Sequence, residues 1–124
     1  MSIDFLPDKP IYQQLIDRIS GDIIRGVVKP GEKLPSVREY AVEVGVNANT
    51  MQRVYKELEL MGISETKRGQ GTFVTENETR LDELRIQMKE NLIASFIHNA
   101  EALGFTKEEM VLSLQQHNGG EQHD

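Results

Sequence analysis

The chain has 124 residues, no cysteine and a formal net charge of −6. A chain of this length holds one modest domain with room for an appendage, and the lack of cysteine excludes disulfides, a thiol nucleophile and thiolate metal ligands. Residues 1–75 hold ten Lys/Arg and ten Asp/Glu, whereas residues 76–124 hold four and ten. The acidic C-terminal part does not exclude a nucleic-acid partner for the neutral part, because salt screens charges more than about 8–10 Å apart.

Neither a membrane protein nor an enzyme is expected. No apolar run approaches the roughly 20 residues that span a bilayer, and no signal peptide is visible, so we expect a cytoplasmic protein without a membrane partner. His98, His117 and His123 lack the spacing of metal ligands. No nucleophile elbow, zinc-protease motif or P-loop occurs. We therefore expect no catalytic residue, no metal and no cofactor.

Residues 10–26 predict an amphipathic helix. Pro10 suits its first turn and Gly26 its end. We expect its apolar stripe to pack against the two helices that follow. The stripe consists of Tyr12, Leu15, Ile16, Ile19 and Ile23.

Residues 36–62 predict a helix, a tight turn and a second helix. Ser36-Val-Arg-Glu39 is a capping box, so the first helix starts at Val37, and Gly45 ends it. Asn47 is a good N-cap for the second helix. Two helices joined this closely cannot lie antiparallel, and a crossing nearer to perpendicular is expected.

The second helix of this pair has two different sides. The buried side is predicted to hold Met51, Val54, Tyr55 and Leu58. The opposite side carries long or amide-bearing donors, which reach base edges and phosphates in nucleic-acid complexes. These donors are Asn49, Gln52, Arg53 and Lys56. An ordinary solvated helix surface is the alternative interpretation of this side.

Residues 63–75 predict a hairpin with a glycine tip. Two short strand-like runs flank Arg68-Gly69-Gln70-Gly71, and the paired glycines permit positive φ at the turn. Lys67 and Arg68 add cationic donors there. A wing of this kind can reach the minor groove or the adjacent DNA backbone, although the pattern is also compatible with a plain turn.

These residues together resemble the GntR family of bacterial transcription regulators. The match covers about residues 10–75, and its many fixed offsets make it more specific than a short motif. It rests on Pro30 through Ser36, Arg38-Glu39, Gly45-Val46-Asn47, Thr50, Leu58, Gly62-Ile63 and Gly69 through Val74.

The resemblance implies a dimer that binds double-stranded DNA through Arg38, the start of the second helix and the glycine tip. Two departures matter, because many members have arginine in place of Ala48 and some have another in place of Gln52. We therefore expect base readout to depend on Asn49, Gln52 and Arg53.

Residues 76–117 predict a long helix, a break at Gly104 and a shorter helix that begins with a capping box at Thr106. Thr79 and Asp82 resemble the N-terminal cap of the long helix. Its apolar surface is broader than one small partner helix would cover, which favours burial against a second chain. About fifty residues hardly enclose the ~300 Å³ of a ligand pocket. The chain thus resembles the short-tailed YtrA-type branch, whose C-terminal helices dimerise.

The predicted fold class is mostly α with a small β-hairpin: a winged helix-turn-helix plus a C-terminal helical dimerisation segment. The predicted domains are a DNA-binding domain at 1–75, a dimerisation region at 76–117 and a flexible tail at 118–124. The predicted function is a sequence-specific regulator, a repressor by analogy, which binds a two-fold operator as a homodimer. No effector ligand is identified. A protein-interaction adaptor and an architectural DNA binder are the alternatives.

The predicted DNA-binding residues are Ser36, Arg38, Asn47, Asn49, Thr50, Gln52, Arg53, Lys56, Lys67, Arg68, Gly69, Gln70, Gly71 and Thr72. The predicted dimer-interface residues are Leu84, Met88, Leu92, Ile93, Phe96, Ile97, Ala100 and Leu103.

Overall fold

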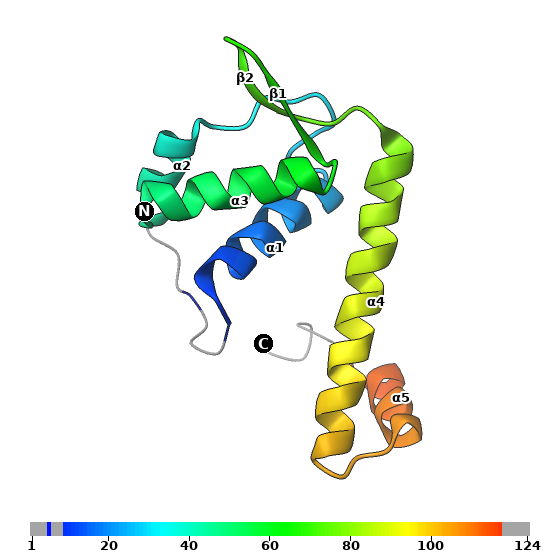
Figure 1. Ribbon diagram of the computed structural model, residues 1–124. Coiled ribbons are helices and arrows are strands. Elements are labelled where there is room, and N and C mark those ends of the chain that lie inside the picture. The colour runs from blue at the N-terminus through cyan, green and yellow to red at the C-terminus, as the bar shows by residue number, and fades with distance from the viewer. Residues whose placement is uncertain (1–4, 6–8, 118–124) are drawn as a thin grey trace, which may run out of the picture. The chain divides into compact units, whose positions relative to one another are not determined.

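A computed structural model describes Phe5 and residues 9–117, and it confirms the predicted fold class (Figure 1). The residues fall into two compact units, one ending at Arg85 and one beginning at Ile86. The predicted tail at 118–124 lies outside the described residues. The elements are α1 (Ile11–Ile24), α2 (Val37–Val44), α3 (Ala48–Leu60), β1 (Ser64–Lys67), β2 (Gly71–Val74), α4 (Glu78–Ala102) and α5 (Lys107–Gln116).

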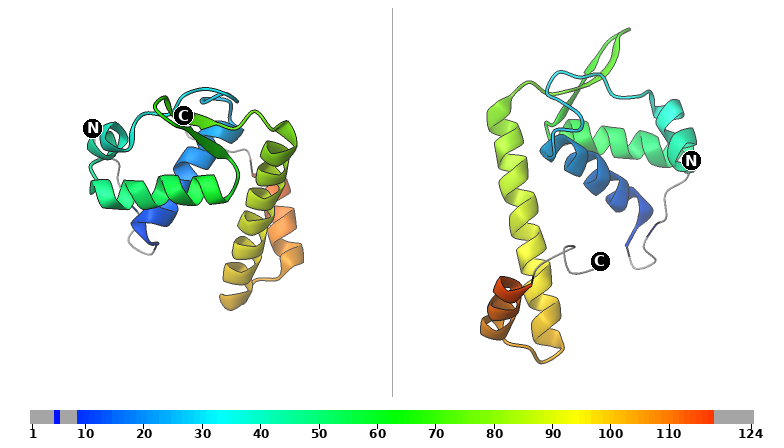
Figure 2. Two further views of the ribbon diagram at one scale, coloured as in Figure 1. Left: turned by 45° about the horizontal axis from the view of Figure 1, so that its top comes forward. Right: turned by 180° about the vertical axis from the view of Figure 1, so that it is seen from behind.

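Helix α3 is the centre of the first unit, because α1, α2 and β1 all contact it. Figure 2 shows this packing from two further directions. The predicted apolar face of α3 is confirmed, since its four residues are between 0% and 5% exposed. Tyr12, expected in the buried stripe of α1, is only half-buried. The core around α3 includes Leu15, Ile16, Ile19, Ile23, Leu34, Tyr40, Ala41, Val44, Ile63 and Val74.

The local signals of the helix-turn-helix act as predicted. The Ser36 hydroxyl accepts a hydrogen bond from the Glu39 amide at 3.1 Å, and the Glu39 carboxylate accepts one from the Ser36 amide at 2.9 Å. Gly45 ends α2 with φ of 78°, a left-handed conformation that costs glycine little. Asn47 caps α3 by accepting from the Asn49 amide at 2.7 Å. Each of these bonds satisfies a backbone group that a helix end leaves unpaired.

The hairpin is held at both edges of β2. Strand β1 pairs antiparallel with β2, and Lys67 faces Gly71 next to the turn. On its other edge, β2 bonds to the segment that precedes α2: the Leu34 amide donates to Thr72 O at 2.8 Å and the Val74 amide donates to Glu32 O at 2.9 Å. This third segment, which the sequence analysis did not anticipate, ties the wing to the start of α2.

The first turns of α4 belong to the first unit. Asn77, rather than the predicted Thr79, caps the helix, because its side-chain oxygen accepts from the Arg80 amide at 3.1 Å. The Arg80 guanidinium donates to Met61 O at 2.6 Å, so the start of α4 is tied to the end of α3. Leu84 is 1% exposed within the chain itself. Its assignment to a dimer interface is therefore corrected: Leu84 is a core residue of the first unit.

The second unit contains the rest of α4 and the shorter helix α5. The predicted capping box of α5 is confirmed, with the Glu109 amide donating to the Thr106 hydroxyl at 3.1 Å and the Thr106 amide donating to Glu109 at 2.9 Å. Ala100 is 6% exposed without any second chain. Its predicted interface role is therefore corrected as well, because this small side chain is already buried within the single chain.

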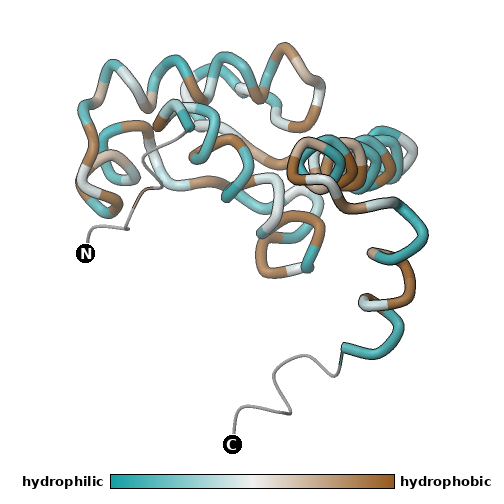
Figure 3. Tube along the Cα trace, turned by 90° about the horizontal axis from the view of Figure 1, so that it is seen from below, coloured by the Kyte–Doolittle hydropathy of each residue, from teal (hydrophilic) through white to brown (hydrophobic). Residues whose placement is uncertain are grey.

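Large apolar side chains remain exposed on the second unit, and apolar residues recur along both of its helices in Figure 3. Leu92 on α4 is 71% exposed, and Leu103 in the turn that follows α4 is 76% exposed. In the part of the chain that the structure describes, no helix is both long and apolar enough to cross a membrane. The other exposed apolar residues of this unit are Ile86, Ile93, Phe96, Phe105, Val111, Leu112 and Leu114.

Replacing Tyr55 by Phe should destabilise the first unit by about 1 kcal/mol. The Tyr55 hydroxyl donates to Pro35 O at 2.6 Å, and the side chain is 5% exposed. Burial raises the pKa of this hydroxyl, so it stays a donor at neutral pH. The variant leaves a carbonyl oxygen without its partner, at a cost of about 1 kcal/mol. Urea unfolding at fixed protein concentration measures the change in the free energy of unfolding.

The matched control is Tyr12→Phe. Tyr12 is half-buried, and its hydroxyl bonds to no other described residue. This variant should change the free energy of unfolding by less than about 0.5 kcal/mol. If both variants had the same free energy of unfolding, the hydrogen bond from Tyr55 to Pro35 would contribute nothing to stability.

Candidate nucleic-acid interface

The start of α2 presents a free cation beside a helix N-terminus. Arg38 is exposed in the first turn and forms no ion pair or hydrogen bond with any other described residue. Ser36 is exposed too, although its hydroxyl serves the capping box. Hydrogen bonds from Ser36 hold the pKa of Glu39 below its ordinary value. The one acidic group in this turn is thus engaged locally, and Arg38 is available to a phosphate.

The exposed side of α3 lies between two flanks that the structure defines. On one flank, Tyr55 bonds to Pro35 at the entrance of α2. On the other flank, Arg53 stacks on Tyr12 of α1, with the guanidinium carbon 4.0 Å from the ring centroid. At roughly 100° per residue, Asn49, Gln52 and Lys56 occupy the arc between these flanks. All three are exposed and present two amides and one ammonium, while the exposed Glu59 and Leu60 share the arc near the C-terminal end of α3.

Two of the predicted residues at the start of α3 have a different placement. Thr50 is half-buried and lies beyond Arg53, toward α1. Asn47 is exposed, but its side-chain oxygen caps α3, which leaves only its amide nitrogen for another partner. Both lie on the margin of the face formed by Asn49, Gln52 and Lys56.

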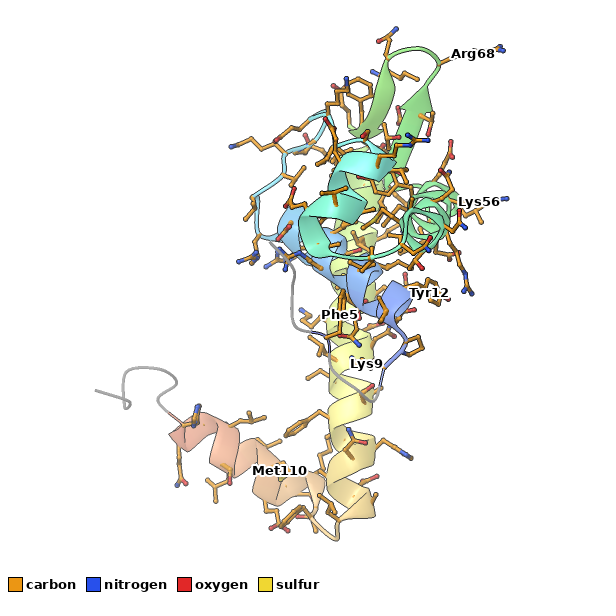
Figure 4. The ribbon with its side chains drawn as sticks, turned by 90° about the vertical axis from the view of Figure 1, so that its left-hand side faces the viewer. Phe5, Lys9, Tyr12, Lys56, Arg68 and Met110 are labelled. Carbon is orange, nitrogen blue, oxygen red and sulfur yellow. The ribbon has the colours of Figure 1, made fainter. Side chains whose placement is uncertain are left out.

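The wing presents its donors at the tip. Lys67, Arg68, Gly69 and Gln70 are exposed, whereas Gly71 and Thr72 are half-buried. Figure 4 shows the side chains of Arg68 at the tip and Lys56 on α3 extending to the same side of the first unit. The wing tip and the exposed side of α3 can therefore meet one ligand that is large enough to reach both.

Two cations hold positions against the wing. The Lys67 ammonium lies 4.7 Å from the centroid of the Phe73 ring. Lys33 forms an isolated bridge with Phe73, and a Cβ added at Gly71 would lie 2.7 Å from Lys33 Cε. Gly71 also has φ of 121°, so only glycine fits there without strain. Lys33 is not among the DNA-binding residues predicted from the sequence, because the pairing of residues 33 and 73 leaves no local signal.

The arrangement suits a polyanion that is long enough to contact the start of α2, the exposed side of α3 and the wing at the same time. Six cationic side chains lie at the start of α2, on α3 and at the wing, while the first 75 residues as a whole are neutral. Glutamates also lie on α2, α3 and β1, so attraction of a phosphate backbone depends on the local placement of the cations rather than on the net charge of these elements. Within the described residues, no group of three or more His, Asp or Glu side chains could hold a metal ion. The six cations are Lys33, Arg38, Arg53, Lys56, Lys67 and Arg68.

Comparisons with known proteins identify the family of the chain. Residues 11–74 match the family described as bacterial regulatory proteins, gntR family. The HTH-type transcriptional repressor YtrA of Bacillus subtilis (strain 168) is 40% identical over 111 residues, which cover 89% of this chain and 85% of that protein.

Two solved structures have the same fold. A GntR family transcriptional regulator from Listeria monocytogenes is 37% identical with a TM-score of 0.83, and the match covers 92% of this chain and all of that chain. The AraR DNA-binding domain in complex with operator ORX1 is 28% identical with a TM-score of 0.54, and the match covers 60% of this chain and 95% of that chain. From the family match over residues 11–74 and the similarity to YtrA along most of both chains, it follows that the chain belongs to the GntR family and to its YtrA-type branch.

Proposed function

We propose that this transcriptional regulator represses its target genes by binding a two-fold operator as a homodimer. Family membership makes it a regulator with a DNA-binding helix-turn-helix; repression, the two-fold operator and the dimer are the proposal. The DNA contact in this proposal rests on one observation. The exposed donors of α3 and the donors of the wing tip lie on the same side of the first unit. A surface built this way fits one helix in a major groove with its wing on the adjacent minor groove.

Each part of the surface has a chemical task in this proposal. The amides of Asn49 and Gln52 are suited to adenine, which offers one donor and one acceptor in the major groove. Lys56 and Arg38 neutralise backbone phosphates, which fix the position of the protein but carry no sequence information. Arg68 and the glycine tip reach the minor groove. The complex between AraR and its operator supports this assignment by analogy.

The second unit supplies the proposed dimer contacts. Its exposed leucines, isoleucines and Phe96 are apolar side chains of the kind that a partner covers at a protein interface. A second copy would cover it, and pairing would double the phosphate contacts of a DNA-binding unit with no net charge. With Leu84 and Ala100 removed, the proposed interface comprises Met88, Leu92, Ile93, Phe96, Ile97 and Leu103.

Repression is proposed from the repressor YtrA. A C₂ dimer with two DNA-binding units requires an operator with two-fold symmetry, and its half-sites should lie about one helical turn or a multiple of it apart. A dimer bound across a promoter blocks the polymerase by occupying the same DNA, and no further activity is required of the chain.

The test is selection of duplexes from a randomised library, followed by fluorescence-anisotropy titration of the enriched duplex and a scrambled duplex of equal length. We expect preference for the enriched duplex by about a thousandfold or more, with affinity that falls steeply as salt rises. Equal binding to both duplexes would favour an architectural DNA binder. If the protein bound neither duplex, the exposed side of α3 would instead be a binding surface for a protein partner.

Replacing Gln52 by Ala should weaken binding to the selected duplex by about 1–3 kcal/mol per half-site. The lost amide is a base-reading group, so the preference at one base position should relax while the salt dependence stays the same. The comparison variant is Arg38→Ala, which should weaken binding to all duplexes alike and reduce the salt dependence. If Gln52→Ala kept full affinity and preference, the exposed side of α3 would not be the base-reading surface.

Replacing Phe96 by Glu should shift the protein from dimer to monomer. Phe96 is 36% exposed on α4, and a carboxylate placed between two apolar helices would lose its hydration without a partner. Light scattering coupled to size-exclusion chromatography measures the mass in solution. Val42→Glu is the control, because Val42 is 80% exposed on α2 and lies outside the proposed interface. A stable dimer in the Phe96 variant would refute this interface.

A further inference from the structure

Tyr12 and Arg53 form a contact between α1 and α3 at the edge of the base-reading side. The guanidinium carbon of Arg53 lies 4.0 Å from the centroid of the Tyr12 ring. Figure 4 shows Tyr12 on the same side of the first unit as Lys56 and Arg68. Helix α1 therefore reaches the edge of the surface that is proposed to face DNA, although sequence patterning assigned Tyr12 to the core.

The contact fixes the face of the guanidinium and leaves its edge free. A cation stacked on an aromatic ring uses the ring's negative face, whereas the five N–H donors of an arginine point outward in the guanidinium plane. Arg53 is exposed and makes no hydrogen bond or ion pair with another described residue. Its donors are therefore oriented by Tyr12 and remain available to a ligand.

The position of Arg53 selects the part of DNA that it meets. Arg53 lies roughly 160° around α3 from Tyr55, the residue that marks the flank toward α2. If Gln52, the proposed base reader, points into a groove, Arg53, which lies roughly 100° from it around α3, points toward the groove wall on the α1 side. A groove wall is lined by phosphates. An arginine there is a backbone anchor rather than a base reader, which revises the role expected from the sequence.

We propose that Tyr12 is a positioning residue that holds Arg53 on a DNA phosphate at the α1 side of the groove. This inference rests on the proposed function and extends the DNA contact surface to α1. An unsupported arginine must give up much rotamer freedom on binding. The stack with Tyr12 removes part of that freedom before DNA arrives. Lys56, which has no aromatic contact among the described residues, lacks this preorganisation.

The test is a double-mutant cycle on the full chain with the selected duplex. Arg53→Gln should weaken binding on the order of a hundredfold, because a two-fold dimer loses one charge-assisted contact in each half-site. It should also reduce the slope of log affinity against log salt by about 2, since two phosphates lose their cation. Tyr12→Leu should weaken binding about tenfold, and Tyr12→Phe, which keeps the ring, should bind like the wild type.

The decisive comparison is Tyr12→Leu in two backgrounds. If Tyr12 acts through Arg53, the leucine variant should have no further effect once Arg53→Gln is present, whereas its effect should persist in the matched background Lys56→Gln. Equal losses in both backgrounds would show that Tyr12 merely supports the fold and would overturn the proposal. An unchanged salt dependence for Arg53→Gln would overturn it as well.

Two controls separate this proposal from the function on which it depends. Thermal unfolding of each variant shows whether lost binding reflects lost structure, and the ring-preserving Tyr12→Phe variant must then bind normally for the positioning role to hold. If the wild type selects no duplex at all, the proposed function fails and the inference falls with it. If the wild type binds selectively but the cycle is additive, only the inference fails.

Discussion

The first unit depends on the burial of one side of α3. Met51, Val54 and Leu58 are fully buried between α1, α2 and β1, and close packing around these side chains leaves α3 no freedom to rotate about its axis. Because residues on a helix keep fixed angular positions, this burial also determines which side chains face outward. The donors of Gln52 and Lys56 are thus placed by the packing on the opposite side of the same helix.

The wing and the start of α2 take their positions from backbone hydrogen bonds rather than from a large core. The segment before α2 pairs with β2 through Glu32 and Leu34, and Tyr55 of α3 bonds to Pro35. These bonds connect the three parts that present cations. A hairpin of two short strands is marginal alone, so this connection is what gives the wing a defined orientation.

Net charge and exposed apolar side chains are distributed unevenly between the two units of the chain. The first 75 residues have no net charge, and cations without an ion pair among the described residues lie on α2, α3 and the wing, while acids such as Glu39 and Glu65 accept hydrogen bonds within the unit. Most of the exposed large apolar residues lie in the second unit, although Val42 and Leu60 are exposed in the first. Helix α4 contributes to both units, because Leu84 packs in the first and the exposed Leu92 belongs to the second.

The sequence by itself determined the features that depend on local physics. The caps at Ser36, Asn47 and Thr106 and the left-handed Gly45 require only neighbouring residues, and the sides of α3 require only the helical period. These features account for the helix bounds and for most of the candidate site.

Only the tertiary structure decided the features that join distant residues. The stack of Arg53 on Tyr12 and the pairing of Lys33 with Phe73 each connect residues 40 or more positions apart in the chain. The same limit explains why Leu84 looks like part of an interface stripe in the sequence. Periodicity shows that a side chain is apolar and on a given side of a helix, but whether its own chain or another covers that side depends on packing that no local pattern encodes.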